Sequence, residues 1–339
     1  MAVATVAAGV ALFGVPSTAS AAQAPCTVPG NCSADTQVLA VTGSGGLFHA
    51  YRSGIDGSWT PFASVLAQAG GFGRVVDTSA SINYGRLYVA AVSSDGGLFW
   101  TIRQQDGSWS PVSNVKASAG DPGRIVDVSI ADIQNTTHFL VRTENGRLFH
   151  AEQGETGFWT QFSDVTAMTG SPGFVTDVAA VLIDYRLHIL VTNSEGNTFH
   201  AVRETTGAWT GLGDVESMTG DPGRVTRVSG TKANGELQIL AGTNTGGLYH
   251  AIRHTDGSWT RIGDVKGATG DPGAVQDVAA GTAFGQDGGG IAGQIQITVA
   301  ANGSVYHALR FADGSWTPLR DVKQVSGDPG PVTRVAISG

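Results

Sequence analysis

The tryptophan of a short D-G-S-W-like motif recurs at a fixed interval, and this interval constrains the fold more than any other feature of the chain. Five successive copies lie 50 residues apart, and the sixth follows after 57 because Phe284–Gly293 adds a glycine-rich segment. A period of this length indicates a supersecondary unit that is repeated along the chain. The copies are Trp59, Trp109, Trp159, Trp209, Trp259 and Trp316.

Each unit has the pattern of four short strands. They are rich in β-branched or aromatic residues and are separated by glycine-containing turns, among which Asn145-Gly146 predicts a two-residue hairpin turn. No helical period is present in the array. Four antiparallel strands per 50 residues are typical of a propeller blade. In the unit Gly123–Gly173, the expected strands are Arg124–Ile130, His138–Thr143, Arg147–Glu152 and Phe158–Phe162.

The two ends of the array complement each other. The first unit begins at Thr36–Val41 and lacks the inner strand of the other units, whereas Val332–Ser338 is one strand more than the last unit needs. We therefore predict an all-β, six-bladed β-propeller of four-stranded antiparallel blades over residues 36–339. The C-terminal strand is expected to join the N-terminal blade and close the ring, which removes open sheet edges.

The first 35 residues differ from the array. Met1–Val15 is apolar and rich in alanine, and the small residues Ala19-Ser20-Ala21 follow it, which predicts a secretory signal peptide over residues 1–21 and export from the cell. No Lys or Arg precedes the apolar run, so we expect the true start to lie upstream. In the next segment, residues 22–35, an oxidising compartment favours a disulfide between Cys26 and Cys32 over a metal site.

The charge pattern argues against two classes of partner. The net charge is −8, and Lys and Arg are not clustered, so neither nucleic acid nor an anionic membrane surface is favoured. The apolar run at the N-terminus is too short to insert across a membrane. The sequence leaves the oligomeric state open, including a homo-oligomer.

A His-x-x-Arg pair recurs in the third strand of the unit. Because strand residues alternate between faces, the His and the Arg of one pair are expected on opposite faces of the blade. Trp100 replaces the His in the second copy, and Gln153 replaces the Arg in the third. The histidines are His49, His150, His200, His250 and His307, and the arginines are Arg52, Arg103, Arg203, Arg253 and Arg310.

These residues allow two interpretations. In the structural one, the His fills a polar socket between blades, the Trp anchors the outer strand, and the Arg pairs with first-strand acids. In the functional one, Arg and His donors hold sugar hydroxyls, and the repeated Trp stacks on the pyranose ring. Trp100 argues against proton transfer at the His position, because indole cannot act as a general base. The acids are Asp77, Asp127, Asp177 and Asp277.

Other polar features favour neither a metal nor catalysis. The Asp of the recurring G-D-P-G loop is expected to bind nearby backbone amides, because a calcium loop needs more oxygen ligands. His138, His188 and His254 break the repeat, but no matching set of acids and nucleophile is evident around them. We expect neither an enzyme nor a cofactor. The loops are Gly120–Gly123, Gly220–Gly223, Gly270–Gly273 and Gly327–Gly330.

The blade pattern G-L-[FY]-H-A-x-R…D-G-S-W-T…G-D-V…G-D-P-G-x-V-x-D-V resembles that of the Photorhabdus-type fucose-binding propeller lectins and of similar repeat proteins exported by soil actinobacteria. It covers residues 36–339, with its clearest copy in Gly246–Arg253, Asp256–Trp259 and Gly270–Gly273. The resemblance implies a lectin that binds fucose or related, O-methylated sugars at several blades. The best-known members have seven blades, and the six-bladed fungal fucose lectins match the blade count but not the motif.

The main alternative is a scaffold that docks another exported protein through its loops. The glycine-rich segment Phe284–Gly293 would be a natural contact for such a partner. A lectin is released by a simple sugar, whereas a docking scaffold is not. The sequence therefore predicts a secreted glycan-binding propeller with six candidate sites. Release by a simple sugar separates this function from docking.

Overall fold

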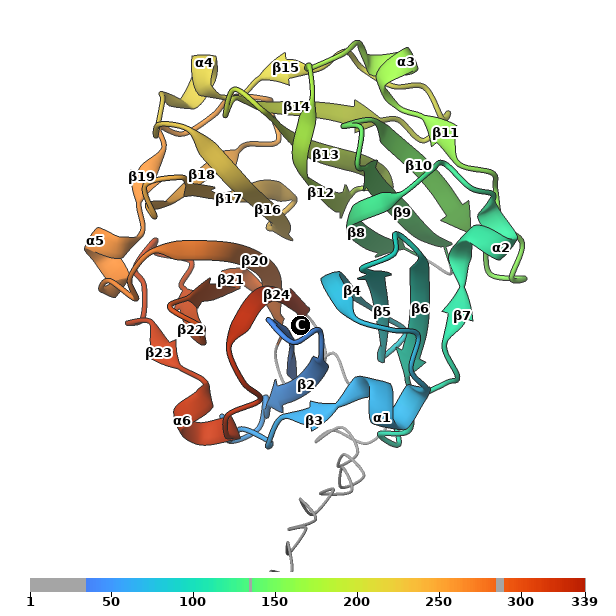
Figure 1. The fold of residues 1–339 in the computed structure, drawn as a ribbon. Coiled ribbons are helices and arrows are strands. Elements are labelled where there is room, and N and C mark those ends of the chain that lie inside the picture. Colours follow the sequence, from blue (N-terminus) through green and yellow to red (C-terminus); the bar gives the residue numbers. More distant parts are fainter. Residues whose placement is uncertain (1–34, 134–135, 285–289, 339) are drawn as a thin grey trace, which may run out of the picture.

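A computed structural model describes residues 35–133, 136–284 and 290–338 of the chain. Six four-stranded antiparallel sheets surround a central axis as the blades of a propeller, and Figure 1 shows them in chain order around the ring. The predicted all-β, six-bladed architecture is confirmed. The expected signal peptide and the Cys26–Cys32 disulfide fall outside the described residues. Within the described ranges, no helix has the length and apolar character needed to cross a membrane.

Within each blade the strands are arranged side by side, with the first-named strand at the central axis and the last-named at the rim. Blade 1 consists of β24 (Val332–Ser338), β1 (Thr36–Thr42), β2 (Leu47–Arg52) and β3 (Ala63–Ser64). Blade 2 consists of β4 (Val75–Asn83), β5 (Arg86–Ser93), β6 (Leu98–Arg103) and β7 (Ser113–Asn114). Blade 3 consists of β8 (Ile125–Ile133), β9 (Thr136–Thr143), β10 (Leu148–Gln153) and β11 (Ser163–Asp164).

The second half of the ring repeats this plan. Blade 4 consists of β12 (Val175–Ile183), β13 (Arg186–Asn193), β14 (Thr198–Arg203) and β15 (Gly213–Asp214). Blade 5 consists of β16 (Val225–Ala233), β17 (Glu236–Thr243), β18 (Leu248–Arg253) and β19 (Gly263–Asp264). Blade 6 consists of β20 (Val275–Phe284), β21 (Gly290–Ala301), β22 (Ser304–Arg310) and β23 (Arg320–Asp321). Phe284 and Gly290 pair at the end of the β20–β21 hairpin, so part of the glycine-rich segment extends two strands.

The last strand closes the ring as predicted. β24 pairs antiparallel with β1, from Gln37 opposite Ser338 to Thr42 opposite Val332, so the two ends of the array share one sheet. The inner strands also bind across blades: the carboxylate of Asp77 in β4 accepts the backbone N–H of Val128 in β8 at 2.9 Å. Two further pairs repeat this bond, Asp177 with Val228 and Asp277 with Val335. These bonds satisfy buried carboxylates and join successive blades at the axis.

One expectation about the outer part of the blade was wrong. Phe158–Phe162 was expected as the fourth strand of blade 3, but that strand is β11, and Trp159 makes only an isolated bridge to Gln153. Each blade also ends in one turn of helix at the rim, which leaves no period in the sequence because it is so short. The helices are α1 (Val65–Ala69), α2 (Val115–Ala119), α3 (Thr166–Thr169), α4 (Glu216–Thr219), α5 (Lys266–Thr269) and α6 (Lys323–Ser326).

The hairpin at Asn145-Gly146 also differs from the prediction. The Thr143 N–H donates to the Arg147 carbonyl at 3.0 Å, and the Gly146 N–H donates to the Thr143 carbonyl, so the loop holds three residues. Gly146 has φ 74, which a glycine adopts without strain. In blade 6, by contrast, Asn302-Gly303 is a true two-residue turn, with Ala301 opposite Ser304. The extra loop residue in blade 3 shifts the register of β9 against β10 by one.

Ring closure gives the first prediction. We expect a chain that ends at Gly330 to lose cooperative unfolding and to self-associate, because the edge of β1 is exposed. Val332, Val335 and Ile337 are buried, and at about 1.5–3 kcal/mol each their burial contributes about 5–9 kcal/mol, a large part of the stability of a folded domain. Urea unfolding and size-exclusion chromatography measure the effect. A chain that lacks residues 1–21 instead is the control, and a truncated chain as stable as this control would contradict the prediction.

Candidate functional site

The third strand of each blade divides its polar residues between two interfaces. In β2, His49 lies on the face that meets blade 2, where its ring is 5.6 Å from Trp109, while Arg52 lies on the face that meets blade 6. The predicted alternation is therefore confirmed. The consequence is that the His and the Arg of one strand do not belong to one site.

Each Arg lies beside the Trp of its own blade. Arg52 forms a cross-strand bridge with Trp59, and the same pairing recurs around the ring with Gln153 in place of Arg in blade 3. An interface site thus combines the Arg–Trp pair of one blade with the His of the preceding blade. The remaining bridges are Arg103–Trp109, Gln153–Trp159, Arg203–Trp209, Arg253–Trp259 and Arg310–Trp316.

The His and Trp rings meet edge to face in each of these interfaces. The ring centroids lie 5.4 Å apart for His307 and Trp59, where blade 6 meets blade 1, and 5.8 Å apart for His200 and Trp259. This geometry is the favourable one for aromatic pairs. Trp100 takes the place of His against Trp159, at 5.8 Å. The other two contacts are His150–Trp209 and His250–Trp316.

The histidines occupy polar sockets inside the blade interfaces, as the structural interpretation predicts. The Nε2 atom of His49 lies 2.7 Å from Gln37 Oε1, and the same bond joins His250 to Gln238 and His307 to Gln296. Burial disfavours the charged imidazole and lowers the pKa of both His250 and His307 to about 3. These rings are neutral at physiological pH and support the neighbouring Trp.

The third-strand arginines do not pair with the first-strand acids, so that part of the structural interpretation is wrong. Asp127 pairs with Arg142 of β9, and Asp277 and Asp177 pair with Arg227 of β16. Arg334 of β24 lies 3.7 Å from Asp77. The four acids, Arg227 and Arg334 come from the innermost strands of their blades, and Arg142 comes from the second strand of blade 3, whereas the Arg–Trp pairs involve the third strand and the segment after it.

Four of the five arginines are half-buried and lie against the turn that precedes the Trp. A Cβ atom at Gly57 would lie 2.6 Å from Nη2 of Arg52, so the glycine at this turn makes room for the guanidinium. Arg103 differs because it is fully buried, with its guanidinium 5.3 Å from the centre of the Tyr51 ring. The half-buried arginines are Arg52, Arg203, Arg253 and Arg310.

The six repeated tryptophans are all half-buried, so part of each residue remains accessible. A cavity of about 480 Å³ opens beside Trp59 where blade 6 meets blade 1. Arg52 and His307 line it, together with the apolar side chains of Leu309 and Val325. Its volume lies in the range of roughly 300–1,000 Å³ typical of small-molecule sites, and its wall combines fixed donors with an aromatic face.

The interface between blades 2 and 3 is built differently. Its cavity of about 380 Å³ is lined by Trp100 and Gln153 in place of the His and the Arg, and also by Tyr88 and Glu155. The Tyr88 and Trp100 rings stack with centroids 5.9 Å apart. At the positions of the His and the Arg, this interface therefore presents an indole and an amide, and the guanidinium in its cavity comes from Arg86 of β5.

The Asp of the G-D-P-G loop binds backbone, as expected. The Oδ1 atom of Asp121 accepts the N–H of Gly123 at 2.9 Å and also lies 2.9 Å from Nζ of Lys116. The Asp of the D-G-S-W turn likewise accepts from the Ser two residues on, and these bonds lower the pKa of Asp56 to about 2. Both aspartates fix turns that position the Arg–Trp pair and the rim helix.

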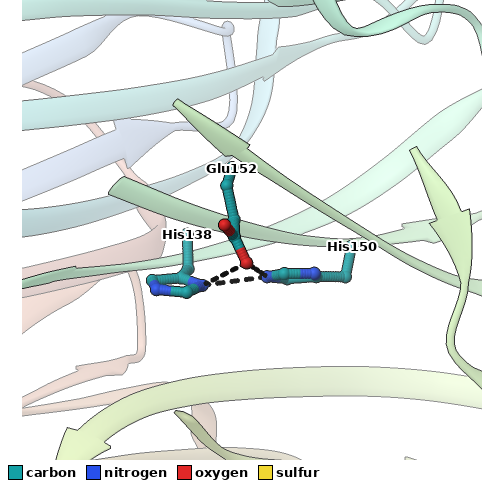
Figure 2. Close-up of side chains that lie close together, drawn as sticks. All are labelled: His138, His150 and Glu152. Atoms are coloured by element: carbon teal, nitrogen blue, oxygen red, sulfur yellow. Dashed lines mark hydrogen bonds and ion pairs between the residues drawn. The ribbon is translucent and has the colours of Figure 1, made fainter. Parts of the chain in front are cut away.

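The three histidines that break the repeat each have a polar partner. His138 lies against His150 and Glu152, as Figure 2 shows, and His188 pairs with His200 at 3.0 Å. His254 is half-exposed, and its Nδ1 atom lies 2.7 Å from Oε1 of Glu236. Glu152 was not among the residues predicted from the sequence. The signal that could have found it is its place two residues after His150, on the same face of the strand.

Searches against known proteins give matches in structure only. No protein-family model matches the chain, and no curated protein matches it. The solved structure of AofleA from Arthrobotrys oligospora matches with a TM-score of 0.66 at 12% identity, over 93% of this chain and 89% of that one. BP39L lectin from Burkholderia pseudomallei matches with a TM-score of 0.60 at 18% identity, over 88% and 82%.

A third match carries a bound sugar. The lectin of Aleuria aurantia, solved as a variant in complex with Fucα1-6GlcNAc, matches with a TM-score of 0.61 at 15% identity, over 83% of this chain and 90% of that one. Another structure of the same lectin is described as a six-bladed β-propeller with a novel fucose recognition mode. At these identities the likeness extends to the fold.

The buried histidines give a pH prediction. The pKa of His250 is about 3 in the folded chain and about 6.5 when exposed, so below pH 6.5 the unfolded chain binds a proton that the folded chain does not. Stability is therefore lost as pH falls from 6.5 towards 3, by up to about 1.4 kcal/mol per pH unit for this group. We expect His250→Gln to reduce the steepness of this loss, as measured by urea unfolding between pH 7.5 and 4.5. Parallel curves for the two proteins would contradict the assignment.

Proposed function

We propose that the protein is a carbohydrate-binding lectin without catalytic activity, and that it binds fucose or related, O-methylated sugars at its blade interfaces. The observation that carries this proposal is the repeated Arg–Trp pair, which in four interfaces lies near the rim with both side chains partly accessible. A pyranose has hydroxyl groups at its edge and an apolar C–H face. Planar guanidinium donors fit the first, and an indole ring fits the second.

Apolar groups beside the donors favour a deoxy or methylated sugar. In the interface between blades 6 and 1, Leu309 and Val325 lie in the same cavity as Arg52 and Trp59. The methyl group of a 6-deoxy sugar or of an O-methyl ether would be covered by such side chains, at about 0.8 kcal/mol for each buried carbon. The structural neighbours support this choice, since the Aleuria aurantia lectin was solved with Fucα1-6GlcNAc and with α-methyl-L-fucoside.

The six interfaces are not equivalent, and we infer four working sites. They are the interfaces that contribute a half-buried Arg, a Trp and a His. The interface between blades 1 and 2 is excluded because Arg103 is fully buried against Tyr51, and the one between blades 2 and 3 has Gln153 in place of Arg. The proposed sites are those of Arg52 with Trp59, Arg203 with Trp209, Arg253 with Trp259, and Arg310 with Trp316.

Repetition would compensate for weak single sites. A millimolar dissociation constant corresponds to about −4 kcal/mol per site. Several such sites on one rigid ring raise the apparent affinity for a glycan-coated surface by about 10²-fold or more. The predicted signal peptide supports a secreted protein, and secretion would place the ring where such surfaces are found.

A glycan array with the labelled protein tests the function. We expect a signal on fucosylated or O-methylated glycans that free L-fucose abolishes. A folded protein that gives no signal on the array would overturn the lectin proposal in favour of a scaffold that docks another exported protein. A signal that the free sugar does not reduce would also contradict binding of a single terminal residue.

The indole N–H signals of the tryptophans test the individual sites, because NMR titration detects millimolar binding. With methyl α-L-fucoside, we expect shifts for Trp59, Trp209, Trp259 and Trp316 and none for Trp109 and Trp159. Arg253→Ala should abolish the shift of Trp259 alone, because that Arg supplies the donors of one site. Gln153→Ala is the matched control and should leave all shifts unchanged. Equal shifts in all six interfaces, or an unaffected Trp259 in Arg253→Ala, would contradict the site assignment.

A further inference from the structure

His138, His150 and Glu152 form a cluster in blade 3, on the face that meets blade 4. Figure 2 shows the three side chains pointing at one another from two adjacent strands, with the carboxylate above the two rings. The Nδ1 atom of His138 lies 3.0 Å from Nε2 of His150 and 3.6 Å from Oε1 of Glu152. The third distance, from His150 Nε2 to Glu152 Oε1, is 3.9 Å.

The register of the hairpin creates this cluster. Glu152 in β10 lies directly opposite His138 in β9, and His150 lies two residues earlier on the same face of β10. Cross-strand neighbours and residues two apart are both within side-chain reach. The two imidazoles are buried, with 6% and 4% of their surfaces exposed, so their orientation is fixed by packing.

We propose that these three side chains bind a zinc ion. Zinc takes imidazole nitrogen at roughly 2.0–2.1 Å and carboxylate oxygen at roughly 2.0–2.2 Å, usually with tetrahedral geometry. Two ligand atoms bound to the same zinc ion are roughly 3.3–3.5 Å apart in such a site. The corresponding distances in the cluster are 3.0, 3.6 and 3.9 Å, so one is shorter than this range and two are longer. Two imidazoles and one carboxylate are also a donor set that zinc uses where it keeps a fourth position for water or another ligand.

A guanidinium lies beside the Glu152 carboxylate, where it can orient this side chain as a metal ligand. Nη2 of Arg203, which comes from blade 4, lies 2.8 Å from Oε1 of Glu152. This contact lacks hydrogen-bond geometry, and the buried oxygen has no other hydrogen-bond partner among the described residues, so it retains lone pairs for a cation. The arginine orients the carboxylate from outside, as groups around metal ligands commonly do. Its positive charge opposes a second cation, so we expect moderate rather than tight binding.

The other interfaces lack one or more of the three ligands. In blades 1, 5 and 6 the partner of the His is a glutamine, such as Gln238 for His250. Blade 4 has a pair of histidines, His188 and His200, with 3.0 Å between Nδ1 and Nε2, but Val202 occupies the position of Glu152. The His188–His200 pair of blade 4 is therefore the internal comparison for two histidines without the carboxylate.

Zinc binding to the untagged full chain, with Cys26→Ser and Cys32→Ser to remove the thiols, tests the proposal. Equilibrium dialysis against zinc chloride should give one bound ion. His138→Gln, which copies the glutamine of blades 1, 5 and 6, and Glu152→Gln should each weaken binding by more than about 10-fold, the smallest effect usually seen even for loss of a group that only supports a ligand. Cobalt(II) in place of zinc should give the visible absorption of a four-coordinate ion in the parent but in neither blade 3 variant.

His188→Gln is the matched control, because it removes one imidazole from the pair that lacks a carboxylate. It should leave the bound zinc unchanged. The proposal is overturned if the parent binds no zinc, if both blade 3 variants bind as the parent does, or if the control loses the ion. Thermal unfolding in the presence of EDTA shows that each variant is folded, and zinc should raise the melting temperature of the parent and the control but not of the two blade 3 variants.

Discussion

The pairing of β24 with β1 is the interaction on which the rest of the structure depends. Blade 1 is assembled from the two ends of the array, so β1 is paired on both sides and is not left as an open sheet edge. Each blade can then bury both of its faces against neighbours, and the buried clusters accordingly contain residues of two adjacent blades, such as Leu39 of blade 1 with Leu87 of blade 2. The repeated bonds from Asp77, Asp177 and Asp277 to the next inner strand add to this closure at the axis.

Closure also makes the interface between blades, rather than the blade, the functional unit. The strand alternation that sends His49 to blade 2 and Arg52 to blade 6 means that every interface receives its polar groups from two copies of the repeat. A substitution at the His of one copy therefore alters the interface with the next blade, and one at the Arg alters the interface with the preceding blade. In the interface of blades 2 and 3, both repeated polar positions are changed, to Trp100 and Gln153. In the interface of blades 1 and 2, Arg103 is present, but the Tyr51 ring lies against its guanidinium.

The fold could be predicted from the sequence because its signals are repeated and local. The spacing of Trp59 and its five counterparts set the blade count, and the surplus strand Val332–Ser338 predicted closure. The partners of the third-strand residues could not be predicted in the same way. Asn145-Gly146 fits either a two-residue turn or a three-residue loop, and only the latter places Glu152 opposite His138. With a two-residue turn, Phe139 would stand opposite Glu152, and His138 would lie on the other face from His150.

Blades 1, 4 and 5 share the register of blade 3, so substitutions alone can give one interface new chemistry while the ring is retained. The socket of the third-strand His tolerates either glutamine or histidine as its partner, because both place one polar atom at about 3 Å from Nε2, as Gln238 and His188 show. A change between these partners alters the donor set without altering the packing of the blade. Glu152 then adds a carboxylate where the other blades have mostly apolar residues, at the edge of the same socket. Two substitutions in one hairpin thus suffice to convert a support for Trp209 into a candidate metal site.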